Sequence, residues 1–218
     1  DDLGHEETYR FDLVDLGRQV MSDVSQQRLH ADLRRALADK DPAAFDQAAE
    51  AFYEAIRDTD ALLQTEHRFQ LGHYLKYPRQ AGASEEENAR HERNARRLIT
   101  RWGATNHLNG YAQRQYGGLL ADFNLRCWQI FLGEVSEDLH AGREFDARSA
   151  HRAVTQYAED WIQQRDEYPA HARGDAIAAA KNIWKKYGSD LNTVSPDDPV
   201  IGRWEYRAEG KEYIRDRK

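Results

Sequence analysis

The sequence predicts an all-α protein, a bundle of about seven helices followed by a short C-terminal β-hairpin. Apolar residues recur at steps close to 3.6 along most of the chain, which is the period of a helix with one buried face. Charged residues make up 32% of the chain, as is typical of amphipathic helices that expose a polar face. With 218 residues, 40% of them hydrophobic, the chain can bury one sizeable core. We therefore expect one helical domain over residues 1–191 and a tail over residues 192–218.

The first two helices are predicted from long apolar stripes. The first should begin near Tyr9 and run to Asp41, because it carries Leu13, Leu16, Val20, Val24, Leu29, Leu33 and Leu37 on one side. Asp41-Pro42 should start the second helix, since Asp is a favoured N-cap and Pro is tolerated at the first helical position. Its stripe consists of Phe45, Ala49, Phe52, Ile56 and Leu63.

Proline, glycine and a capping box delimit the next two helices. A short piece around Leu71, Tyr74 and Leu75 should stop before Pro78, because the residue before proline avoids the α region. Ser84 and Glu87 match a capping box. We expect the helix that they start to place Trp102 on its inward face and to end at Gly103.

The longest apolar pattern runs from Tyr116 to Leu139 and predicts a central helix that ends before Gly142. Gly117-Gly118 would lie inside this helix, where each glycine costs about 1 kcal/mol relative to alanine. We therefore expect a close helix approach or a local kink at these glycines.

Asp146 and Asp175 are the expected N-caps of the last two helices. The first of these helices is bounded by Pro169, and the second should close at Gly188 with Ile177, Ala180, Trp184 and Tyr187 on one face. Beyond a proline-containing linker, the aromatic residues on either side of Ala208-Glu209-Gly210 predict the short β-hairpin.

Charge and hydropathy argue against nucleic-acid and membrane partners. The net charge is -7 and the pI about 5.7, whereas nucleic-acid binders concentrate Lys and Arg. The densest basic run, from Arg93 to Arg101, is expected at a solvated helix end, where cations complement the helix dipole. No apolar run approaches the roughly 18 residues of a membrane span, and the first residues lack the features of a signal peptide.

The residues themselves point to no metal, cofactor or catalytic group. Glu137 and His140 form one Glu-x-x-His pair, but a helical di-iron site needs two such motifs. Because Cys127 is the one cysteine, no intrachain disulfide can form. Its place on an apolar helix face indicates a small core residue. No glycine-rich phosphate loop occurs. Among so many Asp and Glu, no pair can be singled out as the carboxylates of a glycosidase.

Aromatic and amide side chains gather in the predicted loop after the fourth helix, namely Trp102, Asn106, His107, Asn109 and Tyr111. Such groups suit a sugar, because aromatic rings pack on its C–H surface while amides and imidazoles bind its hydroxyls. From the pattern alone an alternative stays open. In that alternative Trp102 ends one core stripe and Tyr111 begins the next.

Several stretches, taken in order, resemble the C-terminal domain of the α-N-acetylglucosaminidases, glycoside hydrolase family 89. Residues 96–103 and 108–120 carry the central match. Residues 9–19 are similar to the family's Tyr-Asp-Leu-Val-Asp-Leu-Thr-Arg-Gln stretch, and residues 173–175 are similar too. Their order and spacing cover most of residues 9–188.

This resemblance implies the accessory helical domain of an exo-acting retaining glycosidase. The family's two catalytic glutamates lie in a (β/α)₈ barrel that this sequence does not contain, so the chain alone should not hydrolyse sugar. The implied partners are that barrel and a glycan ending in N-acetylglucosamine, whose pocket would be lined by Trp102, Leu108 and Tyr111. The residues leave the compartment unknown, and the resemblance implies a secreted, periplasmic or lysosomal enzyme.

The chain departs from the family pattern at three places. Asn109-Gly110-Tyr111 stands where the family usually has Asn-Asp-Tyr, Arg126-Cys127-Trp128 replaces Pro-Arg-Trp, and Tyr116 replaces a tryptophan. A second hypothesis of a different class also accommodates the helical pattern. It is a free-standing helical module that kept the fold, lost the enzyme and binds another protein through its apolar surface.

Overall fold

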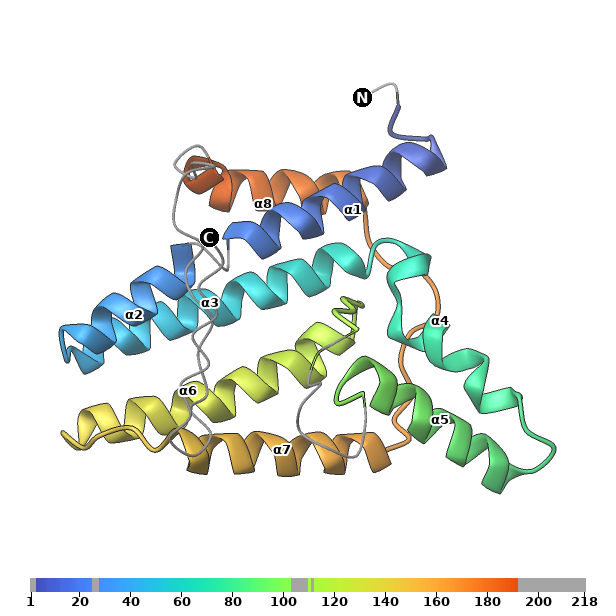
Figure 1. Ribbon diagram of the computed structural model, residues 1–218. Helices are drawn as coiled ribbons and strands as arrows, with labels where there is room; N and C mark the ends of the chain where they lie inside the picture. Colours follow the sequence, from blue (N-terminus) through green and yellow to red (C-terminus); the bar gives the residue numbers. More distant parts are fainter. Residues whose placement is uncertain (1–2, 25–27, 103–109, 111, 192–218) are drawn as a thin grey trace, which may run out of the picture.

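The computed structural model describes residues 3–24, 28–102, 110 and 112–191, and over these residues it contains eight α-helices (Figure 1). The expected all-α class is confirmed. The predicted β-hairpin lies outside the described residues, so both it and the division at residue 192 stay predictions. No described helix is both long and apolar enough to cross a membrane. The helices are α1 (Glu7–Val24), α2 (His30–Ala38), α3 (Pro42–Leu63), α4 (Leu71–Lys76), α5 (Glu85–Ile99), α6 (Leu125–His140), α7 (Ala147–Gln163) and α8 (Ala176–Leu191).

The helices lie in layers of neighbouring pairs (Figure 1), α1 with α8, α2 with α3 and α6 with α7, while α4 and α5 form one end of the molecule. The central helix is α3, because it contacts α1, α2, α6 and α8. The stretch expected to form the central helix, residues 116–139, contributes α6, which is an inner helix between α3 and α7, but α3 contacts more of the other helices.

α3 forms where its cap and apolar stripe predicted it. The Asp41 carboxylate accepts a hydrogen bond from the backbone N–H of Ala44 at 3.0 Å, and Pro42 occupies the first turn. Near its other end, the buried carboxylate of Asp60 accepts hydrogen bonds from the backbone N–H groups of Gly118 and Ala121, at 2.7 and 3.0 Å. α3 therefore also holds the start of the helical segment that leads into α6.

The single helix predicted from Tyr9 to Asp41 is two helices, α1 and α2. The buried face of α1 carries Val14 and Met21, whereas Leu16 is 62% exposed. Gly17 lies on the same side as Val14 and Met21, and a Cβ at this position would come within 2.7 Å of Leu62 Cδ2. Gly17 thus lets α1 pack closely on α3 with the side that carries Val14 and Met21. Leu16 lies on the other side of α1 and points away from α3.

The helix predicted from Tyr116 also begins later than expected. A π-helical stretch, Leu120–Asn124, leads into α6, and Gly117 and Gly118 precede it. Gly118 has a left-handed φ of 94°, and a Cβ there would lie 3.2 Å from Tyr168 Cδ1. The expected close approach at the two glycines is confirmed, although they lie before the helix and not inside it.

The three side-chain caps predicted for the later helices are confirmed. Ser84 Oγ accepts a hydrogen bond from the backbone N–H of Glu87 at 3.2 Å, and the Glu87 carboxylate accepts one from the backbone N–H of Ala83 at 2.8 Å. The carboxylates of Asp146 and Asp175 accept backbone N–H groups in the first turns of α7 and α8.

Two helix ends differ from the prediction. α5 ends at Ile99, before Trp102, and α8 continues past Gly188 to Leu191. Trp184, which was expected on the buried face of α8, is 62% exposed. Tyr187, which was expected on that face, is buried as predicted, and Ile183 joins it in place of Trp184, because these two side chains pack on the main core.

A second hydrophobic core joins α4, α5, α7 and the segment before α6. Beside it, α5 buries an ion pair, since Arg96 Nε donates to Glu92 Oε1 at 3.1 Å and both side chains are at most 1% exposed. Glu92 also accepts from Arg79 at 2.7 Å and from Arg165 at 3.3 Å. The Arg96 guanidinium lies 4.5 Å from the ring centroid of Trp161. These contacts join α5 to α7 and to the chain that follows α7.

Burial opposes the ionisation of Glu92, but the hydrogen bonds and charges of Arg79 and Arg96 outweigh it, so the pKa of Glu92 lies below its ordinary value. A carboxyl group with a lowered folded-state pKa stabilises the protein at pH values above its unfolded-state pKa. That stability is lost as the pH falls through the folded-state pKa.

We predict that Gly118→Ala lowers the free energy of unfolding by about 1–2 kcal/mol, because a left-handed φ penalises any side chain and the new Cβ would press on Tyr168. Urea unfolding at pH 7 measures this. Gly133→Ala is the matched control in α6, where a Cβ would meet nothing within 4 Å, and it should gain about 0.5–1 kcal/mol. Equal stability of Gly118→Ala and the parent would contradict the close approach.

We predict that Glu92→Gln costs about 3–5 kcal/mol at pH 7, because it leaves buried Arg96 without its counter-charge. Glu50→Gln, which breaks a surface pair with Arg57, should cost less than about 1 kcal/mol. The parent and the Glu92→Gln variant should converge in stability as the pH falls below about 4.5, the ordinary pKa of this group. Unfolding curves from pH 7 down to acid test this, and a pH-independent difference would argue against the ionised state of Glu92.

Candidate functional site

Trp102 is the one predicted sugar-contacting residue among the described residues, since Leu108 and Tyr111 lie outside them. It comes after the end of α5, has a left-handed φ of 58° and is 41% exposed. The expectation that it faces inward along a helix was therefore wrong. Its exposure also speaks against the alternative in which it ends a core stripe. Part of this large aromatic ring therefore lies at the surface, as is common for aromatic residues that contact a ligand or another chain.

The backbone of Trp102 is held by the end of α5. We name residues 97–102 the α5 exit. The N–H of Trp102 donates to the carbonyl oxygen of Arg97 at 2.7 Å, and Thr100 Oγ1 donates to the carbonyl oxygen of Arg96 at 2.8 Å. The carbonyl oxygen of Thr100 accepts the N–H of Gly110 at 2.6 Å. The two sides of the stretch that was expected to bind sugar thus meet at Thr100.

Gln115 connects this region to α1. Its side-chain amide donates to Ser22 Oγ at 2.7 Å, and its Oε1 accepts from Arg18 at 3.3 Å. Arg18 in turn forms an ion pair with Asp15 at 2.6 Å. Two of the stretches that carry the family resemblance, residues 9–19 and 108–120, therefore meet in space.

Tyr116 and Gly117, which follow Gln115, are placed by α4 and by the segment that joins α3 to α4. The Tyr116 ring stacks on Tyr74, with centroids 5.3 Å apart, and burial raises the pKa of both phenols. The N–H of Gly117 donates to the carbonyl oxygen of Phe69 at 2.7 Å. The carbonyl oxygen of Gln64 accepts the N–H of Arg173 at 2.7 Å, which brings the third stretch of the resemblance to the end of α3.

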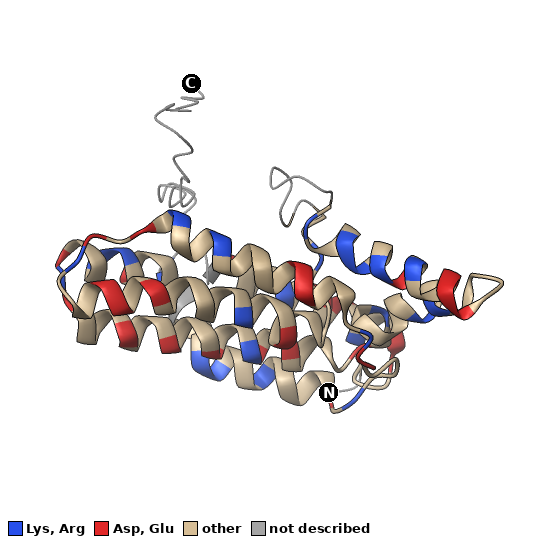
Figure 2. Cartoon of the chain, turned by 90° about the horizontal axis from the view of Figure 1, so that it is seen from below, with Lys and Arg blue, Asp and Glu red and all other residues tan. Residues whose placement is uncertain are grey.

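The basic run of α5 has specific partners. In Figure 2 the blue stretches of α5 mark its Lys and Arg positions, and the red stretch at its start marks its acidic positions. Arg96 is fully buried against Glu92, and Glu159 of α7 accepts hydrogen bonds from both Arg97 and Arg101. The expectation of a solvated helix end was therefore wrong, because these arginines join α5 to α7.

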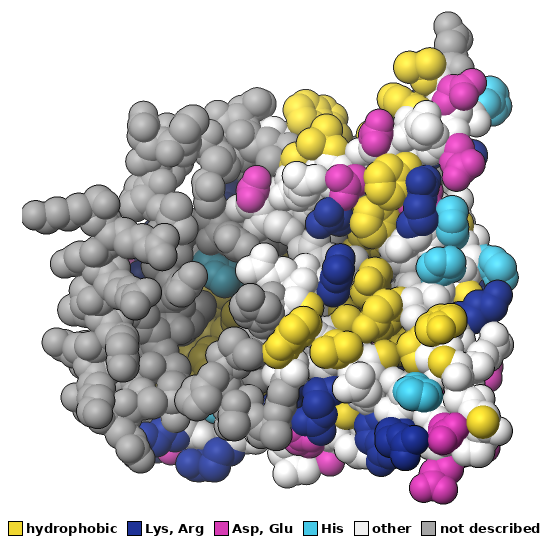
Figure 3. Space-filling model, turned by 45° about the vertical axis from the view of Figure 1, so that its right-hand side comes forward, with side chains coloured by type: hydrophobic (Ala, Val, Ile, Leu, Met, Phe, Trp, Pro, Cys, Tyr) yellow, Lys and Arg dark blue, Asp and Glu magenta, His cyan; other side chains and the backbone are white. Residues whose placement is uncertain are grey.

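Hydrophobic side chains also reach the surface. Figure 3 shows a group of them on one face, among basic and histidine side chains. Exposed apolar surface of this kind is typical of a face that another chain or a ligand covers. Within the described part of the chain, the large hydrophobic residues that are exposed are Leu3, Tyr9, Leu16, Tyr77, Trp102 and Trp184.

Other candidate chemistry has structural explanations. His140 pairs with Asp46 at 2.8 Å, and within the described ranges no group of three or more His, Cys, Asp or Glu could hold a metal ion. Burial raises the pKa of the Cys127 thiol to about 12, which disfavours the nucleophilic thiolate.

Glu159 and Gln115 were not singled out from the sequence. Their partners lie far away along the chain, Arg101 for Glu159 and Ser22 for Gln115, and helical periodicity carries no information on such pairs. The excess of arginine at the end of α5 was the available signal. Several cations on one helix end imply an acidic partner if they are buried.

Comparison with known proteins identifies the family of this chain. The family model of the alpha-N-acetylglucosaminidase (NAGLU) C-terminal domain matches residues 1–186. Human alpha-N-acetylglucosaminidase is 31% identical over 180 residues, which are 82% of this chain and 24% of that protein. The chain therefore spans about a quarter of the length of this relative.

Solved structures show the same fold. A family 89 glycoside hydrolase from Clostridium perfringens, in complex with 2-acetamido-1,2-dideoxynojirmycin, superposes with a TM-score of 0.74 at 22% identity, over 82% of this chain and 21% of that one. Its complex with PUGNAc gives a TM-score of 0.73 with the same identity and coverage. The match of the family model over residues 1–186 shows that this chain belongs to the family of α-N-acetylglucosaminidase C-terminal domains.

Proposed function

We propose that this chain packs beside a catalytic (β/α)₈ barrel of a retaining α-N-acetylglucosaminidase. There, Trp102, Leu108 and Tyr111 would help to form the pocket for a terminal N-acetylglucosamine. The observation that carries this proposal is the exposed Trp102 at the α5 exit, inside a domain that makes up only 24% of its human relative and 21% of the clostridial one. A domain that forms such a small part of an enzyme is suited to supplement a site that lies mainly in the rest of that enzyme.

The chemistry of a sugar pocket supports the role of Trp102. A pyranose offers an apolar C–H surface that packs on an aromatic ring. Trp102 keeps 41% of its surface exposed while its backbone is hydrogen-bonded to α5. A ring with a defined backbone loses little conformational freedom on binding.

The buried glutamates of the described residues are unsuited to the role of a glycosidase's general acid. A glycosidase acid needs a raised pKa. Glu66 and Glu92 have lowered pKa values, because hydrogen bonds from Arg68 and from Arg79 with Arg96 outweigh the effect of burial. The carboxylate of Asp60 accepts hydrogen bonds from two backbone N–H groups, those of Gly118 and Ala121. This supports the proposal that the catalytic carboxylates come from the barrel.

The class of protein is tested by measuring the mass of the native polypeptide and its hydrolysis of an aryl α-N-acetylglucosaminide, next to the same assay on this chain. We expect a longer native chain that is active, and no activity from the 218 residues alone. A native polypeptide of this length without activity would contradict the proposal and favour the free-standing protein-interaction module.

We predict that Trp102→Ala in the active polypeptide raises KM roughly tenfold, as expected for the loss of about 1.5 kcal/mol of aromatic contact. Trp102→Phe should recover part of this loss. Trp184→Ala is the matched control, because it removes an exposed tryptophan from α8 and should leave KM unchanged. Kinetics on the aryl glycoside measure all three variants. An unchanged KM for Trp102→Ala would exclude the contact with the sugar.

A further inference from the structure

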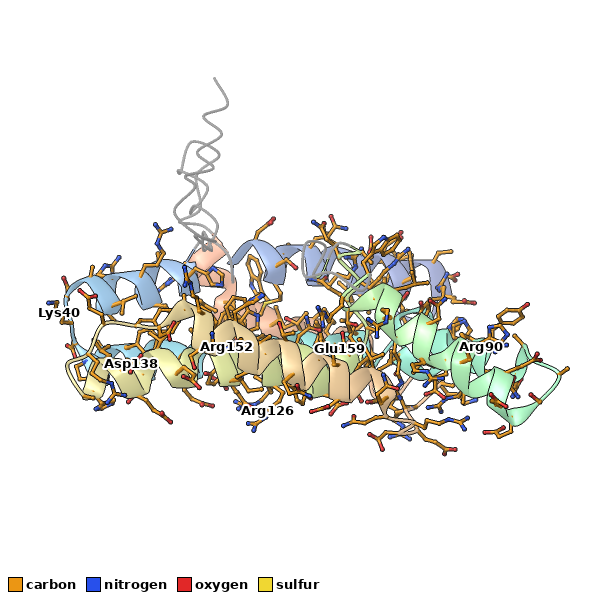
Figure 4. All side chains as sticks on the ribbon, turned by 60° about the horizontal axis from the view of Figure 1, so that its bottom comes forward. Lys40, Arg90, Arg126, Asp138, Arg152 and Glu159 are labelled. Carbon is orange, nitrogen blue, oxygen red and sulfur yellow. The ribbon has the colours of Figure 1, made fainter. Side chains whose placement is uncertain are left out.

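The carboxylate of Glu159 accepts hydrogen bonds from an arginine at the start of the α5 exit and from one near its end. Glu159 Oε2 accepts from Arg97 at 2.9 Å, and Glu159 Oε1 accepts from Arg97 at 3.3 Å and also from Arg101. Arg97 is the first residue of the α5 exit, and Arg101 directly precedes Trp102. Figure 4 shows Glu159 on α7, beside the end of α5.

The burial of the arginines separates this arrangement from an ordinary surface pair. The Arg101 side chain is 6% exposed and that of Arg97 is 27% exposed, whereas Glu159 is 33% exposed. Exposed pairs of long side chains contribute little and do not fix a geometry. A carboxylate that accepts from two arginines, one of them buried, restricts both side chains and the backbone between them.

The backbone passes this restriction on to Trp102. The carbonyl oxygen of Arg97, whose side chain Glu159 holds, accepts the N–H of Trp102 at 2.7 Å. The residue before Trp102 is held by the same carboxylate. Trp102 adopts a φ of 58°, which is unfavourable for a non-glycine residue and needs support from its surroundings.

We propose that Glu159 is a positioning residue that fixes the orientation of Trp102 by holding Arg97 and Arg101. It acts through the arginines and does not touch the sugar. The consequence for sugar binding rests on the proposed function, whereas the effect on Trp102 does not.

The test is ¹⁹F NMR of this chain labelled with 5-fluorotryptophan, which reports on its five tryptophans. Trp102→Phe assigns the Trp102 resonance by its disappearance. We expect Glu159→Gln to shift or broaden this resonance while those of Trp128 and Trp184, on α6 and α8, keep their positions. Asp160→Asn is the matched control on α7, because the Asp160 carboxylate accepts a hydrogen bond from Gln156 and has no described contact with the α5 exit. It should leave the Trp102 resonance unchanged.

Glu159→Asp keeps the charge and shortens the reach, so it should move the Trp102 resonance in the same direction by a smaller amount. This variant also serves if Glu159→Gln fails to fold. An unmoved Trp102 resonance in a folded Glu159→Gln or Glu159→Asp variant would overturn the proposal. An equal shift in Asp160→Asn would overturn it as well, because the effect would then be a general one of charge on α7.

Kinetics of the active polypeptide separate this proposal from the proposed function. If both hold, Glu159→Gln should raise KM severalfold with a smaller change in kcat, in the same direction as the rise in KM predicted for Trp102→Ala. If the Trp102 resonance moves while KM stays the same, Glu159 positions Trp102, but the proposed contact between Trp102 and the sugar is refuted.

Discussion

A carboxylate that is buried away from water needs cations or hydrogen-bond donors around it. Glu92 of α5 is such a carboxylate, at the end of the molecule that α4 and α5 form. Arg79, Arg96 and Arg165 meet this need from three separate segments. α5 can therefore take only an orientation in which these partners converge. The direction in which the chain leaves α5, and with it the place of Trp102, depends on this buried cluster.

The position of the candidate site follows from how the helices meet at that end. Asp60 of α3 holds Gly118, Gln115 reaches α1, and Gly110 returns to Thr100 at the α5 exit. The chain on either side of the expected sugar-binding stretch is thus hydrogen-bonded to helices of both cores. Trp102 presents an exposed ring from this surrounding structure, as a domain that completes a neighbour's pocket requires.

Much of the fold could be predicted from the sequence, because caps and apolar periodicity are local. Asp41, Ser84, Asp146 and Asp175 cap the helices that they were expected to cap. The faces of α1 and α8 were less predictable, since Gly17 and Ile183 point inward only in response to particular neighbours. The candidate site was indicated by the aromatic and amide side chains of the loop after α5 and by the family resemblance. Its supports could not be foreseen, because ion pairs between α5 and α7 leave no periodic signal in the sequence.

Hydrogen exchange at the backbone N–H groups of Trp102 and Gly110 tests most directly whether the helical frame holds the site in place. We expect both to exchange as slowly as the amides in the middle of α5, because both donate short hydrogen bonds into the α5 exit. Exchange as fast as that of exposed, unbonded amides would contradict it. Trp102 would then have no defined position to offer a sugar.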